Sequence, residues 1–143
     1  MQRVLIEAAG GPIELEADVF VEPIARAGIE QLRQGWGDGP LRARLARLHD
    51  DPEAVFMGWS ACWTAPAFQD WNISAELAAI RCPALAAQGT PDQYGSLAQL
   101  AEIRRRVPQA QLLVLDGCRH VAHAERPGDV RAAVVAFLSR RAQ

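Results

Sequence analysis

Two loops of this 143-residue chain contain side chains that commonly exchange protons. Asp92 lies in the first loop and His120 in the second, and each loop directly follows a short apolar run, at 84–87 and at 112–115. A carboxylate that accepts a hydrogen bond from one ring nitrogen of a histidine fixes its tautomer, and it stabilises the imidazolium formed when the other nitrogen takes a proton. Asp92 and His120 are therefore a candidate acid–base pair. The alternative interpretation is that Asp92 supports a turn and His120 is an ordinary surface-loop residue.

We expect the two apolar runs to be neighbouring parallel strands, whose following loops lie side by side. Ligands and catalytic groups gather beyond the carboxyl ends of such strands. Between the runs, apolar residues of 97–107 recur at helical spacing. Ser96, with Gln99 three residues later, predicts a capping box at the start of this helix. A further helix opens at Pro127. The order strand, helix, strand, helix predicts a right-handed parallel βαβ unit with a covering C-terminal helix.

The chain begins with two shorter β-like runs, at 3–8 and 13–17. Gly10, Gly11 and Pro12 separate them and indicate a turn. Because a parallel crossover needs a dozen or more residues, a connection this short predicts antiparallel pairing of the two runs.

From about residue 22 to residue 80 the apolar spacing is helical. Asp51 followed by Pro52 predicts the start of one of these helices. All four tryptophans lie in this block, and they form either its plain core or the lining of an apolar ligand pocket. The residues that we select as candidates for substrate binding are Trp59, Trp63, Phe68 and Trp71.

Composition narrows the function classes. Half of the residues are hydrophobic and 22% are charged, which is typical of a folded globular domain. A net charge of -2 argues against a broadly basic nucleic-acid binder. No apolar run has the ~20 residues of a membrane helix, and the first residues lack the apolar core of a secretory signal. We therefore expect a cytoplasmic protein that binds neither nucleic acid nor membrane.

The residue bias and the cysteines add two expectations. All basic side chains other than histidine are arginine, a bias typical of a GC-rich, bacterial genome. The three cysteines lack C-x-x-C spacing, which argues against a disulfide framework and against a structural zinc site. We expect no metal and no cofactor.

The two loops also resemble motifs of a known family. Residues 80–95 resemble the I-x-x-P-x-L-x-x-x-G-x-x-D stretch of α/β-hydrolases, in which the Asp is the triad acid. Residues 115–127 resemble the family's final G-H-x-x-x-x-E-x-P loop, in which the His is the general base. Here Arg119 replaces the glycine before the histidine, so we expect a less tightly turned loop. Residues 13–23 resemble the strand that leads into the helical cap of these enzymes.

The resemblance implies a fold of the α/β class, namely a partial α/β-hydrolase fold. We expect a small, mainly parallel sheet of three to four strands with flanking helices and an inserted helical cap. Residues 1–21 and 81–143 would form the partial core, and residues 22–80 would form the cap. Asp92 would be the triad acid and His120 the base.

One part of the family's machinery is not found in the sequence. The triad order is Ser, Asp or Glu, His, and the Ser lies on a G-x-S-x-G elbow upstream of the cap. No serine precedes the cap. The nearest mimic, around Ser60, lies inside a predicted helix and lacks the second glycine. Cys118 lies on the base's own loop, so we expect neither residue to be a nucleophile. The segment that forms the oxyanion hole is missing as well.

Two function classes follow. In the first, the chain is the C-terminal portion of a serine-type α/β-hydrolase that cleaves an ester, or a related acyl or carbon–carbon bond, in a small apolar substrate. It would be inactive until a complementary N-terminal subunit supplies the nucleophile. In the second, it is a non-catalytic binding or assembly module derived from a hydrolase, which includes the case of a homo-oligomer. A neighbouring reading frame with a G-x-S-x-G motif would favour the first class, and a stable oligomer the second.

Overall fold

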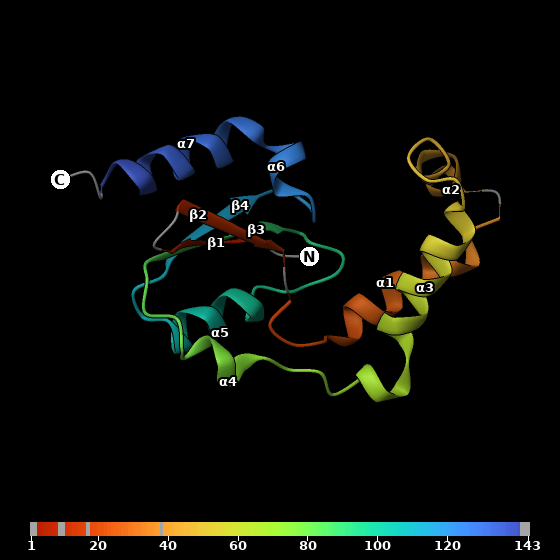
Figure 1. Ribbon diagram of the computed structural model, residues 1–143, viewed down its shortest axis with the longest axis horizontal. Helices are drawn as coiled ribbons and strands as arrows, with labels where there is room; N and C mark the ends of the chain where they lie inside the picture. Colours follow the sequence, from red (N-terminus) through yellow and green to blue (C-terminus); the bar gives the residue numbers. More distant parts are fainter. Residues whose placement is uncertain (1–2, 9–10, 17, 38, 141–143) are drawn as a thin grey trace. The chain divides into compact units, whose positions relative to one another are not determined.

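The computed structural model of the protein describes residues 3–8, 11–16, 18–37 and 39–140. The chain forms two compact units. The first, which we call the sheet unit, comprises Met1–Phe20 and Asn72–Gln143, and the second, the helical unit, comprises Val21–Trp71. Figure 1 labels the elements of both units. Within the described ranges no helix is both long and apolar enough to cross a membrane.

The described residues of the sheet unit form one four-stranded sheet in the order β2-β1-β3-β4. Its strands are β1 (Arg3–Ala8), β2 (Gly11–Glu16), β3 (Ala84–Thr90) and β4 (Gln111–Asp116). As predicted, β1 and β2 pair antiparallel and β3 and β4 pair parallel. Gly10, in the predicted turn, and Ala17, at the predicted end of the second strand, lie outside the described residues.

The sheet is mixed, whereas the sequence predicts a mainly parallel one. The difference lies in β1, which pairs antiparallel with β3 as well as with β2, with Leu5 opposite Leu85. A strand that returns through a tight turn runs opposite to its hairpin partner, and here that strand also covers the free edge of β3. Parallel pairing is therefore confined to β3 and β4.

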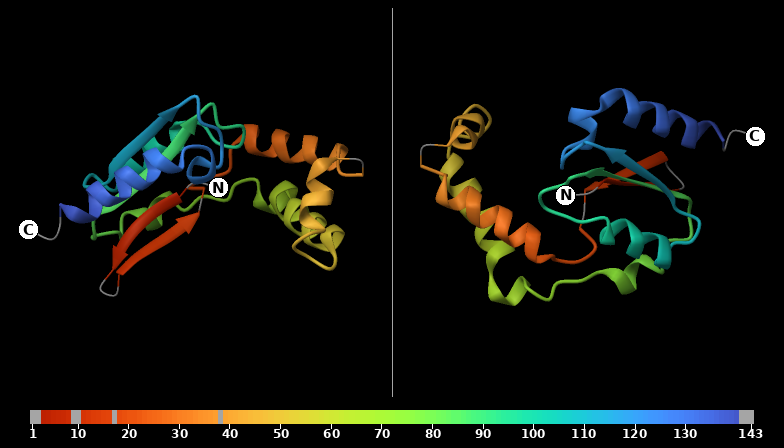
Figure 2. Two further views of the ribbon diagram at one scale, coloured as in Figure 1. Left: turned by 90° about the horizontal axis from the view of Figure 1, so that it is seen from above. Right: turned by 180° about the vertical axis from the view of Figure 1, so that it is seen from behind.

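The predicted βαβ unit consists of β3, α5 (Ala98–Arg106) and β4. Helix α5, together with the short α4 (Ser74–Leu77), covers one face of the sheet, and α6 (Ala122–Glu125) and α7 (Pro127–Ser139) cover the other (Figures 1 and 2). Strand β3 is consequently buried along most of its length. A strand that is covered on both faces has a continuous apolar sequence, which is why apolar and polar residues do not alternate along β3.

The main core of the sheet unit lies between β3 and α5. Ala84 and Ala86 of β3 are both about 1% exposed and face this helix, because alternate residues of a strand point to the same side. The residues that fill the core with them are Val19, Leu77, Leu100, Ile103, Val107 and Ala110. The small alanines let α5 approach the sheet closely. This packing fixes the strand whose end begins the Asp92 loop.

The Gln99 side chain does not form its part of the capping box predicted at Ser96 and Gln99. The Ser96 hydroxyl accepts a hydrogen bond from the N–H of Ala98, the first residue of α5. The Gln99 side chain is buried and spans to a distant segment. It accepts a hydrogen bond from the Val19 N–H (2.9 Å) and donates one to the Phe20 carbonyl (2.8 Å). The prediction was wrong because these buried backbone groups recruit the amide that a box would use.

The helical unit contains α1 (Pro23–Gln34), α2 (Pro40–Leu45), α3 (Pro52–Thr64) and the 3-10 turn η1 (Pro66–Phe68). Asp51 caps α3 as predicted, by accepting from the Ala54 N–H at 2.9 Å. Trp36 stacks on Phe56 with ring centroids 4.1 Å apart, and both residues are buried. This stack joins the end of α1 to α3.

The helical unit ends at Trp71, before the predicted end of the helical block at residue 80. Phe20 and Asn72 form an isolated antiparallel bridge, and the Ile73 N–H donates to the Val19 carbonyl at 2.8 Å. Beyond this bridge, Leu77 of α4 packs into the core of the sheet unit. Residues 72–80 have helical spacing, but Leu77 and Ile80 pack against the core of the sheet unit, to which this segment belongs.

Candidate acid–base site

The ends of β3 and β4 bring two loops together. Thr90 and Asp116 are register partners at these ends, and the Thr90 hydroxyl donates to Oδ1 of Asp116 at 3.0 Å. One residue earlier, Gly89 lies against the loop that follows β4, where a β-carbon would collide with the carbonyl oxygens of Cys118 and Arg119. Glycine is required at this position because the backbones themselves make the contact.

The structure brings Asp92 and His120 together at this edge of the sheet. Nδ1 of His120 lies 3.0 Å from both carboxylate oxygens of Asp92. The Asp92 side chain is 2% exposed and the His120 side chain is 16% exposed. An ionised carboxylate only accepts hydrogen bonds, so Nδ1 carries the hydrogen in this contact. The proton-accepting atom of the neutral ring is then Nε2, which is the arrangement of a general base held by an acid.

Asp92 also organises its own loop. Its Oδ1 accepts from the Tyr94 N–H at 2.8 Å, which is a side-chain-supported turn. Burial raises the pKa of Asp92, and the hydrogen bond from the Tyr94 backbone opposes that rise. The loop is tied back to β3 by the Gln88 amide, which donates to the carbonyls of Gly95 (2.8 Å) and Ser96 (3.1 Å). Asp92 therefore supports a turn and holds His120 at once, so the two interpretations of its sequence position are compatible.

The loop that carries His120 is held by Glu125. The Glu125 carboxylate accepts from the backbone N–H groups of Arg119 (3.1 Å) and Val121 (3.4 Å), on either side of the histidine. The Arg119 side chain adds a contact from its Nε at 3.4 Å. The hydrogen bond from the Arg119 backbone holds the pKa of Glu125 below its usual range. The motif contained this glutamate, but its role appears only once the loop is folded.

Arg119 does not distort this loop. The left-handed turn of the loop lies at Gly117, with φ at 66°, and no non-glycine residue in the described part of the chain has a positive φ. Arg119 occupies the position at which the family has glycine, and its own backbone is not left-handed. Its backbone and guanidinium both bind Glu125, so the replacement adds a contact to the loop.

Tyr94 is a site residue that the sequence analysis missed. Its ring packs edge-to-face against the His120 imidazole, with centroids 4.8 Å apart and planes at 77°. Burial raises the pKa of Tyr94, so its phenol stays neutral well above neutral pH. The only sequence signal was its position two residues after Asp92, where a turn brings the backbone back to the carboxylate.

Neither Ser60 nor Cys118 is activated as a nucleophile. The Ser60 side chain is fully buried in α3, and its hydroxyl contacts Arg33 (3.2 Å) and the Met57 carbonyl (3.4 Å). Cys118 is also buried, and burial raises the pKa of its thiol, which lowers the thiolate fraction. In the described part of the chain, no three His, Cys, Asp or Glu side chains gather so as to hold a metal ion.

The four candidate substrate-binding residues lie in the helical unit and are half-buried. Trp63, Phe68 and Trp71 form one mutual cluster, with ring centroids 5.2 to 6.3 Å apart. Trp59 instead contacts Phe56, with ring centroids 6.0 Å apart. Part of each ring therefore contributes to the core of this small unit, as the plainer of the two interpretations expects.

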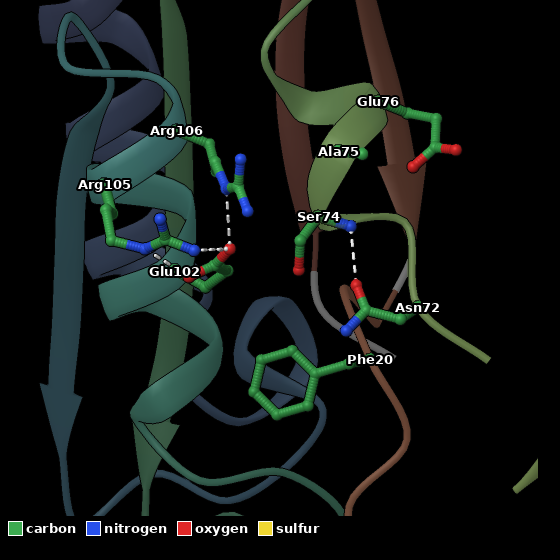
Figure 3. A pocket seen from close by; sticks show the side chains of 8 residues that line it. All are labelled: Phe20, Asn72, Ser74, Ala75, Glu76, Glu102, Arg105 and Arg106. Atoms are coloured by element: carbon green, nitrogen blue, oxygen red, sulfur yellow. Dashed lines mark hydrogen bonds and ion pairs between the residues drawn. The ribbon is translucent and has the colours of Figure 1, made fainter. Parts of the chain in front are cut away.

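A separate open pocket of about 530 Å³ lies in the sheet unit (Figure 3). It is lined by Phe20, Asn72, Ser74, Ala75, Glu76, Glu102, Arg105 and Arg106. Glu102 accepts hydrogen bonds from both Arg105 and Arg106, and these contacts hold its pKa at about 2. Three of the charged groups in the pocket, Glu102, Arg105 and Arg106, thus pair with one another, and neither Asp92 nor His120 lines it.

We compared the chain with known protein families, sequences and structures. No protein-family model and no curated protein sequence matches the chain. Among solved structures, an E-2-(acetamidomethylene)succinate hydrolase matches 87% of this chain with a TM-score of 0.59 and 17% identity. An esterase from Thermogutta terrifontis matches 87% of it with a TM-score of 0.54 and 21% identity. A proline iminopeptidase from Mycobacterium smegmatis matches 83% of it with a TM-score of 0.50 and 18% identity.

These matches extend over 56%, 53% and 48% of the three hydrolases, respectively. The chain thus spans about half the length of the hydrolases that it resembles. At these identities the likeness concerns the fold and not the activity. The chain has a partial α/β-hydrolase fold.

Proposed function

We propose that this chain supplies the acid and the base of a serine-type α/β-hydrolase reaction. The observation that carries the proposal is the contact between Asp92 and His120, in which both carboxylate oxygens lie 3.0 Å from Nδ1. The pair lies beyond the carboxyl ends of two parallel strands, where α/β proteins place their chemistry. Its loops are fixed by Gln88 on one side and by Glu125 on the other.

In this reaction Nε2 of His120 takes the proton from a serine hydroxyl while the serine oxygen bonds to the substrate's carbonyl carbon. The imidazolium then gives that proton to the leaving alcohol as the ester bond breaks, and an acyl-serine forms. Water repeats the two steps and releases the acid. Asp92 stays ionised throughout, where it holds the tautomer of His120 and stabilises the imidazolium.

The nucleophile and the oxyanion-hole donors belong, in this proposal, to polypeptide other than these 143 residues. The sequence has no G-x-S-x-G elbow, and its buried Ser60 and Cys118 are unsuited to the role. A complementary N-terminal portion is thus the partner that we propose. The isolated chain is expected to be inactive, because an acid–base pair without nucleophile or oxyanion hole retains little catalysis.

The substrate class that we propose is an ester or a related acyl compound with an apolar part. The structural neighbours include an esterase and two other hydrolases, which supports this class at the level of fold. We assign the helical unit the role of the cap, and its aromatic residues Trp59, Trp63, Phe68 and Trp71 the role of contacting the apolar part. Half-buried aromatic rings suit this role, since they offer large apolar area at low entropic cost.

Complementation tests the proposal. The DNA beside the gene is read for a G-x-S-x-G segment, its product is purified, and hydrolysis of a short-chain aryl ester is measured for each polypeptide alone and for the mixture. We expect activity only in the mixture. We expect it to be abolished by His120→Ala and lowered by roughly 10⁴-fold by Asp92→Asn. A mixture that stays inactive, while the chain alone forms a stable oligomer, would favour the binding-module hypothesis.

A further inference from the structure

We propose that Tyr94 is a positioning residue for the acid–base pair, which holds Asp92 through its backbone and His120 through its ring. This inference rests on the proposed function, since it assigns a role within the same site. Tyr94 contacts both Asp92 and His120. It lies outside the motif positions that identify the acid and the base.

The first contact fixes the carboxylate. The Tyr94 N–H donates to Oδ1 of Asp92 at 2.8 Å, so the backbone at Tyr94 determines where that oxygen lies. The backbone is itself fixed one residue later, where the buried Gln88 amide donates to the Gly95 carbonyl at 2.8 Å. Tyr94 thus lies in a short segment that is held at both ends.

The second contact fixes the imidazole. The hydrogen bond from Nδ1 to Asp92 sets the position of one ring nitrogen, and the Tyr94 ring contacts the imidazole itself. The torsion that sets the tilt of the imidazole is soft, because rotation about a terminal sp³–sp² bond has broad minima. The Tyr94 ring, at 4.8 Å and 77° to the imidazole, restricts that rotation. Tyr94 thus helps to set the direction of Nε2, the atom that must reach a serine hydroxyl.

The aromatic ring, and not the hydroxyl, performs this role. Tyr94 is half-buried, and the contact with His120 is between ring faces and edges. Because the phenol stays neutral, it adds no charge beside the imidazole. Phenylalanine should therefore replace tyrosine here, whereas an aliphatic side chain should not.

The experiment measures the tautomer of His120 by long-range ¹H–¹⁵N NMR in the full chain, labelled with ¹⁵N-histidine. The variants are Tyr94→Phe, which keeps the ring, and Tyr94→Leu and Tyr94→Met, which remove it. Gln93→Ala, which removes a hydrogen bond to the Tyr94 phenol but keeps the ring, is the matched control. His123 in the same sample reports whether an effect is local, and backbone amide spectra show which variants are folded.

We expect wild type, Tyr94→Phe and Gln93→Ala to show neutral His120 as a single Nδ1–H tautomer with a slowly exchanging Nδ1 proton. In Tyr94→Leu or Tyr94→Met, we expect mixed tautomers and faster exchange of that proton, while His123 is unchanged. The inference is overturned if a folded aliphatic variant keeps the wild-type tautomer and exchange rate, or if Tyr94→Phe behaves like Tyr94→Leu.

Asp92→Asn separates this inference from the proposed function. If His120 does not respond to Asp92→Asn, the acid–base pair itself fails and the proposed function fails with it. If His120 responds to Asp92→Asn but not to loss of the Tyr94 ring, only the role of Tyr94 is refuted.

Discussion

Gly89 at the end of β3 approaches Cys118 so closely that a β-carbon on Gly89 would collide with the Cys118 carbonyl oxygen. The collision would involve backbone atoms, so side-chain rotation cannot relieve it. The loop that follows β4 must therefore pass over a residue without a side chain. This close approach sets the distance between the Asp92 loop and the His120 loop.

Gly89→Ala is expected to push the two loops apart. Overpacking of a well-packed site costs about 1–3 kcal/mol, and the contact between Asp92 and His120 should be lost with it. Urea unfolding and the NMR tautomer of His120 check both effects. Gly58→Ala is the matched control, because Gly58 lies in α3 with open space around it. That variant should gain up to about 1 kcal/mol from helix propensity. Equal effects of the two substitutions would contradict the steric argument.

Glu125 should hold the His120 loop through its charge. We expect Glu125→Ala to speed hydrogen exchange of the Arg119 and Val121 amides, which donate to this carboxylate, while Glu125→Gln preserves part of the protection. Hydrogen-exchange mass spectrometry or NMR measures this. Glu76→Gln, a change at an exposed position of α4, is the control for the change in charge. Unchanged exchange at both amides in Glu125→Ala would refute the role.

The loop contact of Glu125 also predicts a pH dependence. The folded-state pKa of Glu125 is lowered from 4.5, so the contact stabilises the fold above that pH and is lost as the pH falls through the lowered value. Amide protection at Arg119 and Val121 should therefore persist at pH 5 and disappear in more acidic solution. Protection that is lost already between pH 7 and pH 5 would be inconsistent with this assignment.

The acid–base contact could be predicted from the sequence because it follows from topology. Two apolar runs separated by one helix become neighbouring parallel strands, and the loops after them must meet. The residue types in those loops then leave few partners for His120. Neither inference needs the detailed conformation of the loops.

Contacts that depend on tertiary competition could not be predicted. The S-x-x-Q pattern at Ser96 is the same whether Gln99 caps its own helix or reaches Val19. Only the folded chain shows that the backbone N–H of Val19 lies within reach of the Gln99 side chain. Likewise, nothing local to β1 indicates that it pairs with β3 as well as with β2. The contact of Tyr94 with His120 depends on the exact turn of one loop and the tilt of one ring.

The buried contact of Gln99 should be needed for stability. Gln99→Ala leaves the Val19 N–H and the Phe20 carbonyl without this partner, and an unsatisfied buried group costs about 1–3 kcal/mol. We expect a total loss of at least about 2 kcal/mol in urea unfolding. Gln109→Ala is the control, because Gln109 bonds backbone carbonyls on the exposed surface, and a loss within about 0.5 kcal/mol is expected there. Similar losses for the two glutamines would be incompatible with the role given to Gln99.

Asp92, which holds His120, should lower the stability of the fold at neutral pH because its ionised carboxylate is buried. Burial raises its folded-state pKa above 3.8, so ionisation is less favourable in the folded than in the unfolded chain. The stability that the protonated Asp92 carboxyl contributes is fully present below pH 3.8. It is lost as the pH rises through the raised folded-state pKa of Asp92. Asp92→Asn removes this ionisation but keeps an oxygen that can accept from the Tyr94 N–H.

We therefore expect Asp92→Asn to melt at or above the wild-type temperature at pH 8, with the difference shrinking towards pH 4. Calorimetry at pH 4, 6 and 8 measures this, and NMR at pH 8 should show at the same time that His120 no longer keeps a single tautomer. Asp129→Asn serves as the control, since Asp129 pairs with Arg126 on the exposed surface of α7. A melting temperature several degrees below wild type at pH 8 would mean that the contact with His120 outweighs the cost of burying the carboxylate. The pair would then stabilise the fold, and the trade between stability and chemistry that marks functional sites would not apply to Asp92.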